Sequence, residues 1–84
     1  MNRHRASFYP TPEWEVPHDE IVEILVGYDV VINDAVSRHH PEVPLTSAER
    51  DDALAALGYR RIGPWTEFPD DRAEAPVVPA EKGV

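Results

Sequence analysis

The sequence predicts a small α+β domain in which a short antiparallel sheet, formed by strands from both chain ends, packs against two helices. Three observations support this fold class: a helix with both ends marked between Thr46 and Gly58, an amphipathic segment at 19–37, and aromatic and β-branched stretches near both chain ends. A chain of 84 residues has room for one domain. We assign residues 1–69 to that domain and 70–84 to a flexible acidic, proline-containing tail.

The best-defined element is the helix that follows Thr46. Thr46 and Glu49 have the spacing of a capping box, in which each side chain accepts a hydrogen bond from the other residue's backbone amide. Gly58 supplies the left-handed residue that commonly ends a helix. The sequence therefore predicts a helix that begins after Thr46 and ends at Gly58.

The segment 19–37 has two interpretations. On a helical wheel most of its Ile, Val and Leu side chains fall on one arc, and Glu20, Glu23 and Asp34 lie opposite, which favours a helix. Gly27 disfavours a helix interior, and strands on either side of Gly27-Tyr28-Asp29 would make a hairpin. We take the helix as the prediction and the hairpin as its alternative.

The remaining elements are short strands. Residues 3–9 and 13–16 carry aromatic side chains among prolines, a composition typical of extended chain. Residues 59–62 and 65–68 flank Gly63-Pro64, which predicts a strand that is either broken or folded into a hairpin there.

The charge distribution is uneven. The net charge is −8, and no Lys or Arg occurs between Ala6 and Ser37, where seven carboxylates lie. Such a surface repels the phosphate backbone, so direct binding to nucleic acid is disfavoured. A basic partner protein suits it better, and the simpler alternative is that the acidity only keeps the protein soluble.

A candidate surface for a partner follows from the helical interpretation of 19–37. Val26 and Val30 would form an apolar strip bordered by carboxylates, a composition suited to a protein contact. The candidate partner-binding residues are Glu13, Glu15, Glu20, Glu23, Val26, Val30 and Asp34. They predict a non-catalytic interaction module, a regulator or accessory subunit that binds a basic surface of another protein, and a homodimer is compatible with the sequence.

An alternative function is that the carboxylates imitate nucleic-acid phosphates, so that the protein inhibits a DNA-binding protein, as in phage or mobile-element inhibitors.

A catalytic alternative rests on Ser37, His39 and His40, which a small enzyme or ligand-binding subunit could use. Glycine-rich phosphate loops and the nucleophile elbow are missing from the sequence, and so is cysteine. The adjacent histidines, with His18 and Glu42, do not have the spacing of metal ligands on one helix face. We therefore expect a protein that is not an enzyme and has no cofactor or metal.

Two further expectations concern location and source. No apolar run is long enough for a membrane span and no secretion signal is evident, so a soluble cytoplasmic protein is expected. The runs Ala48-Glu49-Arg50, Ala53–Tyr59 and Trp65-Thr66-Glu67 resemble short actinobacterial proteins of uncharacterised function. The resemblance covers about a quarter of the chain and implies no activity.

Overall fold

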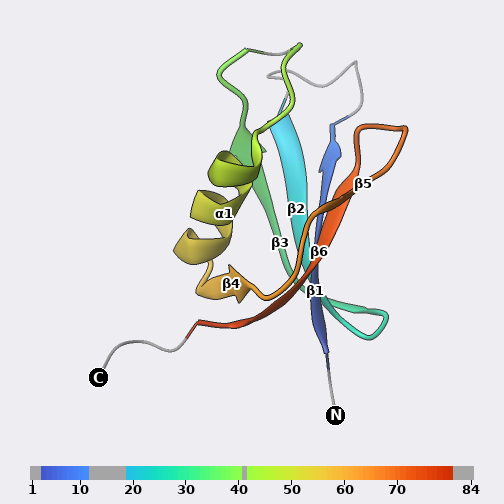
Figure 1. Cartoon of the computed structure of the whole chain (residues 1–84), viewed down its shortest axis with the longest axis vertical. Helices are drawn as coiled ribbons and strands as arrows, with labels where there is room; N and C mark the ends of the chain where they lie inside the picture. The colour runs from blue at the N-terminus through green and yellow to red at the C-terminus, as the bar shows by residue number, and fades with distance from the viewer. Residues whose placement is uncertain (1–2, 12–18, 41, 81–84) are drawn as a thin grey trace.

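The computed structural model describes residues 3–11, 19–40 and 42–80, and it is dominated by one antiparallel sheet. In chain order the elements are β1 (His4–Pro10), β2 (Asp19–Val26), β3 (Asp29–Ser37), α1 (Ser47–Ala56), β4 (Tyr59–Arg61), β5 (Thr66–Glu67) and β6 (Ala73–Pro79). The strand order is β3-β2-β1-β6-β4, and β5 also pairs with β6. The helix α1 lies against one face of this sheet (Figure 1). The prediction of two helices on a short sheet is therefore wrong, since the described residues form a larger sheet and one helix.

The prediction of a helix at 19–37 is wrong: the segment forms the β2–β3 hairpin, which was the alternative. Val26 pairs with Asp29, so Gly27 and Tyr28 form a two-residue turn. Gly27 has a φ of 63°, while Tyr28 keeps a negative φ, a combination typical of a type II′ hairpin turn. A register shift between Ile24 and Leu25 marks a β-bulge nearby.

The prediction failed because β2 carries apolar side chains on both faces. Val22 and Ile24 face α1, while Ile21 and Leu25 occupy the alternate positions and face the other side. A strand that is apolar on both faces has no two-residue alternation, so its side chains can also be arranged along one arc of a helical wheel.

The core lies between the sheet and α1. Alternate residues of three strands meet Leu54 of α1 and Leu45 of the preceding loop, and all are nearly or fully buried. The strand residues of this cluster are Ala6, Phe8, Val22, Ile24 and Val77. Phe8 also makes an edge-to-face contact with Trp65, with the ring centroids 5.4 Å apart. These contacts fix α1 over the sheet.

The prediction for the helix after Thr46 is confirmed. The Thr46 hydroxyl accepts a hydrogen bond from the Glu49 amide at 3.2 Å, and the Glu49 carboxylate accepts one from the Thr46 amide at 2.9 Å. Gly58 follows the helix with a φ of 86°. Both ends of the helix therefore depend on the residues that the sequence indicates.

Residues 73–79 form a central strand, β6, within the segment 70–84 that the sequence predicts to be a flexible tail. Ala73–Pro79 pairs with β1 on one side and with β4 and β5 on the other. Pro76 lies between the stretches that pair with β4 and β5, and its carbonyl accepts a hydrogen bond from the Ile62 amide. A strand residue directs its nitrogen and its oxygen to the same side, so this proline removes no hydrogen bond to β1.

The other strand predictions have mixed outcomes. The strand expected at 3–9 is β1. The stretch around Gly63-Pro64 is a broken strand, because β4 and β5 each pair with β6 and not with each other. The strand expected at 13–16 lies outside the described residues.

Candidate functional site

The exposed edge of the sheet is its β3 strand. Within the described part of the chain, β3 pairs with β2 only, and of its nine residues just Ile32 and Val36 are partly buried. Val30 and Val31 are 47% and 51% exposed. An edge of this length presents backbone groups that another strand can pair with.

One backbone amide at this edge already has a local acceptor. The Ala35 amide donates to Oδ1 of Asp34 at 2.8 Å, so the acceptor is a side chain of β3 itself and not a carbonyl of β2. Because antiparallel strands alternate the direction of their backbone groups, Asn33 and Ser37 also direct their backbone groups to the free edge. Asp34 therefore occupies the middle of the edge.

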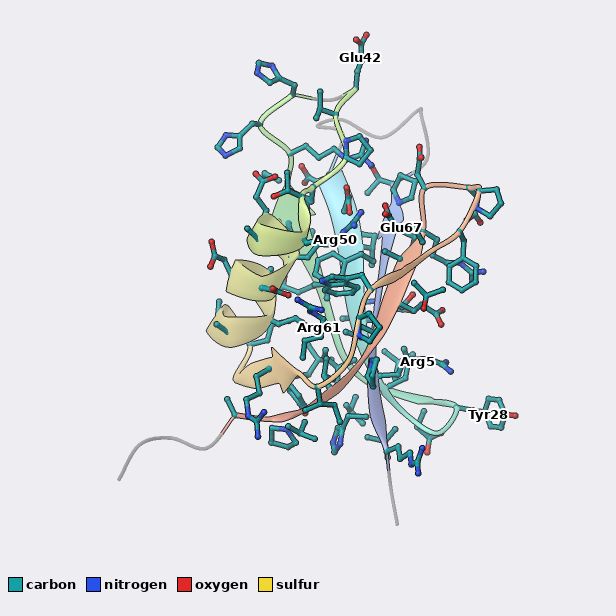
Figure 2. The ribbon with its side chains drawn as sticks, viewed as in Figure 1. Arg5, Tyr28, Glu42, Arg50, Arg61 and Glu67 are labelled. Atoms are coloured by element: carbon teal, nitrogen blue, oxygen red, sulfur yellow. The ribbon has the colours of Figure 1, made fainter. Side chains whose placement is uncertain are left out.

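The face of the sheet opposite α1, which we call the outer face, is covered by no helix among the described residues. Arg5 and Tyr28 point away from α1, whereas Arg50 lies between α1 and the sheet (Figure 2). By strand register, the outer face nearest the β3 edge carries Tyr9, Ile21, Glu23, Leu25, Val30, Asn33 and Ala35. It combines apolar side chains with a carboxylate.

Glu23 lies at the centre of this outer face. Its carboxylate accepts a hydrogen bond from the Asn33 side chain at 3.1 Å, and it has no cationic partner among residues 3–11, 19–40 and 42–80. Burial raises the pKa of the Tyr9 hydroxyl, and the charge and hydrogen bond of Glu23 raise it further. Glu23 thus brings an uncompensated negative charge to the outer face.

A groove of about 310 Å³ separates α1 from the β3 edge. It is lined by Val22, Asp34, Ala35, Val36, Ser37, Ala53, Ala56 and Leu57. Asp34 is the one charged residue in this lining, and its side chain is exposed. The groove therefore offers apolar walls and a single carboxylate, and it opens beside the free edge.

A second hollow, of about 410 Å³, lies beside β1, β5 and β6 and reaches the β2–β3 turn. It is lined by Arg3, His4, Arg5, Gly27, Thr66, Phe68, Glu74, Ala75 and Pro76. Arg5 lies 3.7 Å from the Glu74 carboxylate, and Arg72 lies at the same distance from it. The Glu74 carboxylate thus partly neutralises the cations of this region.

Glu20 is fully buried, so the prediction that it belongs to a partner-binding surface is wrong. In the hairpin it shares the α1 side of β2 with Val22, and Oε2 accepts hydrogen bonds from Arg38 Nε at 2.9 Å and the Leu45 amide at 2.8 Å. Arg50 Nη2 lies 3.5 Å from Oε1. These contacts tie β2 to the loop before α1 and to α1 itself, and so hold the helix beside the groove.

The other candidate residues separate into distinct places. Val30 lies on the outer face with Glu23, whereas Val26 is partly buried and pairs with Asp29, so the two valines do not form one strip. Asp34 lies at the groove. Glu13 and Glu15 lie outside the described residues.

The residues of the catalytic alternative do not lie in an enclosed site. Ser37, His39 and His40 are all exposed, and His39 Nε2 lies 3.3 Å from the Glu49 carboxylate. Glu42 is exposed, and His18 lies outside the described residues. No group of three or more potential metal ligands occurs within the described ranges.

The groove could not be predicted from the sequence, because it exists only where α1 and β3 lie side by side. The only signal was the run Ala53–Leu57, whose small side chains at positions 53 and 56 leave space beside the sheet.

None of the helical structure in the described ranges is long and apolar enough to span a membrane. Comparisons with family models, curated proteins and solved structures find no match.

Proposed function

We propose that the protein is a non-catalytic protein-binding module, a regulator or accessory subunit, that binds a basic surface of a partner protein through the β3 side of its sheet. The observation that carries the proposal is the β3 edge itself. It is nine residues long and largely exposed, and it belongs to the part of the chain without Lys or Arg.

The carboxylates near this edge support a basic partner. Asp29 and Asp34 are exposed, and together with Glu23 they have no cationic partner within the described part of the chain. Exposed carboxylates add little to folding stability, but they attract an oppositely charged surface over a screening length of about 8 Å at physiological salt.

The surface is elongated and includes apolar side chains. At about 3.4 Å per residue, β3 extends for about 30 Å. The outer face beside it adds the apolar side chains Ile21, Leu25 and Val30. An apolar centre with charged neighbours is the usual composition of a non-obligate protein interface.

The test compares two variants that each lose three negative charges. The edge variant carries Glu23→Gln, Asp29→Asn and Asp34→Asn, and the control variant carries Glu42→Gln, Glu67→Gln and Asp71→Asn at exposed positions away from β3. Each is immobilised and used to capture proteins from a lysate of the source organism, with circular dichroism to verify folding.

The wild-type protein and the control variant should capture a common basic partner, and the edge variant should lose it. The association rate of the purified pair should fall as salt rises. Equal capture by the two variants would show that the acidity of the β3 side is not used for binding, and the proposal would fail.

A further inference from the structure

The β3 edge and the α1–β3 groove are two parts of one surface. Residues 34–37 belong to the free edge and also line the groove, whose opposite wall is formed by Ala53, Ala56 and Leu57 of α1. A strand added to β3 would therefore lie directly along the mouth of the groove.

Strand geometry decides which side chains of an added strand enter the groove. In an antiparallel pair, residues directly opposite each other place their side chains on the same face of the sheet, with Cβ atoms about 5 Å apart. Asp34 and Val36 lie on the α1 side of β3, because they pair with Val22 and Glu20 on the core side of β2. A residue opposite Asp34 would therefore project into the groove.

The groove has the chemistry of a site for a long basic side chain. Val36, Ala53 and Ala56 offer apolar walls for a methylene stem, and Asp34 offers a carboxylate for the charged end. The charges of α1 do not oppose a cation there, since Asp52 is acidic and exposed and the one cation of the helix, Arg50, is buried against Glu20.

We infer that β3 binds an extended segment of the partner by antiparallel strand addition, and that one Arg or Lys of this segment lies in the α1–β3 groove against Asp34. The inference rests on the proposed function and specifies the class of partner. Backbone hydrogen bonds to the edge supply affinity in this mode of recognition, and the groove supplies specificity.

Asp34 has a different role before and after binding. In the free protein it accepts the Ala35 amide, which occupies a backbone donor at the edge and opposes random pairing. In the complex the Ala35 amide donates to a carbonyl of the added strand, and the carboxylate turns to the partner's cation.

Charge favours a basic segment over a second copy of this chain. Each copy has a net charge of −8, and two β3 edges would bring two sets of uncompensated carboxylates together. A basic segment instead replaces water around Asp34 with a charge-assisted contact.

The experiment begins with a displayed library of random nonapeptides selected against the full-length protein. Enriched peptides should share one Arg or Lys among β-branched residues. Two derivatives of the tightest peptide serve as matched controls: one with citrulline, the neutral isostere of Arg, at the basic position (after replacing Lys by Arg if needed), and one with alternate backbone amides N-methylated.

Nuclear magnetic resonance then locates the peptide on the ¹⁵N-labelled protein. Binding should slow hydrogen exchange of the Ala35 amide and shift the resonances of Ala53 and Ala56. N-methylation should abolish binding, and citrulline should weaken it about tenfold, or about 1.4 kcal/mol. Asp34→Asn should weaken the Arg peptide by a similar factor and leave the citrulline peptide unchanged.

Failure to enrich any peptide, tight binding of the N-methylated peptide, or shifts confined to surfaces away from β3 would each overturn the inference. So would concentration-dependent dimerisation that protects the Ala35 amide, because a second copy would then occupy the edge. The proposed function is tested separately by the captured partner: if the edge variant loses this partner but the partner leaves the Ala35 amide unprotected, charge-dependent binding stands and strand addition falls.

Discussion

Glu20 and Glu23 lie three residues apart on β2 and project from opposite faces of the sheet. Glu20 is fully buried between Arg38 and Arg50, whereas Glu23 is partly exposed beside Tyr9 and Asn33. One strand thus holds one carboxylate that is buried within the fold and another that lies on the outer face. Their identical chemistry makes them matched probes of burial.

Glu20→Gln should destabilise the protein by about 3 kcal/mol, because the amide leaves two buried guanidinium groups without a counter-charge. Glu23→Gln should change the stability by less than about 0.5 kcal/mol, the usual range for surface positions. Urea denaturation followed by circular dichroism measures both. Equal losses in the two variants would mean that Glu20 is not the buried centre of this cluster.

Glu23→Gln should also lower the pKa of the Tyr9 hydroxyl toward 10.0, while leaving it somewhat above that value because the shift from burial remains. The raised pKa stabilises the fold below pH 10, and this contribution is lost as the pH rises through the folded-state pKa. Titration of the tyrosine ring resonances measures the shift. Glu67→Gln is the control and should leave Tyr9 unchanged, so an equal change in both variants would contradict the Tyr9–Glu23 contact.

Gly27→Ala should destabilise the protein by about 1 kcal/mol, since a φ of 63° is costly for alanine. The helical interpretation of 19–37 requires the opposite result, a gain in stability. Gly27→Asn is the matched control and should lose less, because asparagine tolerates positive φ in primed turns. Thermal unfolding ranks the three proteins, and an alanine variant at least as stable as wild type would exclude the turn.

Local signals in the sequence were sufficient for α1 and insufficient for the hairpin. The capping box and Gly58 act within one turn of α1, so their residues determine where the helix begins and ends. The choice between helix and hairpin at 19–37 depends on strands that pair from elsewhere in the chain, and β1 covers one side of β2 through contacts distant in sequence.

The candidate site was predicted in part for the same reason. The charge of the segment could be inferred from composition. The helical interpretation also predicted that Val30 is exposed, and Val30 is exposed, but on a strand. The burial of Glu20 could not be inferred, because its partners Arg38 and Arg50 come from a loop and a helix that only the fold brings together. The groove beside Asp34 likewise exists only once α1 lies next to β3.

Asp51→Asn should lower stability at neutral pH and have a smaller effect in acid. The hydrogen bonds from Arg61, at 3.0 and 3.1 Å, lower the pKa of Asp51, and the indole of Trp65 contributes at 3.2 Å. A lowered folded-state pKa gives stability that is present above the ordinary value of 3.8 and is lost as the pH falls through the folded-state pKa.

Urea midpoints of the Asp51→Asn variant and the wild type, measured at neutral pH and at successively lower pH, test this prediction. The two curves should converge on acidification. Asp52→Asn, one position along the same helix and exposed, is the control and should leave the wild-type pH profile unchanged. A constant difference at every pH would mean that the Asp51 charge does not contribute.

The central position of β6 determines when the sheet can be completed during folding. β6 includes residues 73–79, yet it pairs with β1 and joins it to β4 and β5, with Ser7 opposite Glu74. The sheet therefore cannot be completed until residues 73–79 have been synthesised and can pair with β1. Until then the β1–β2–β3 hairpins have a second open edge at β1, which exposes pairing groups that the finished protein encloses. Folding should accordingly be slow for a domain of this size, because its central pairing joins strands that lie far apart in the sequence.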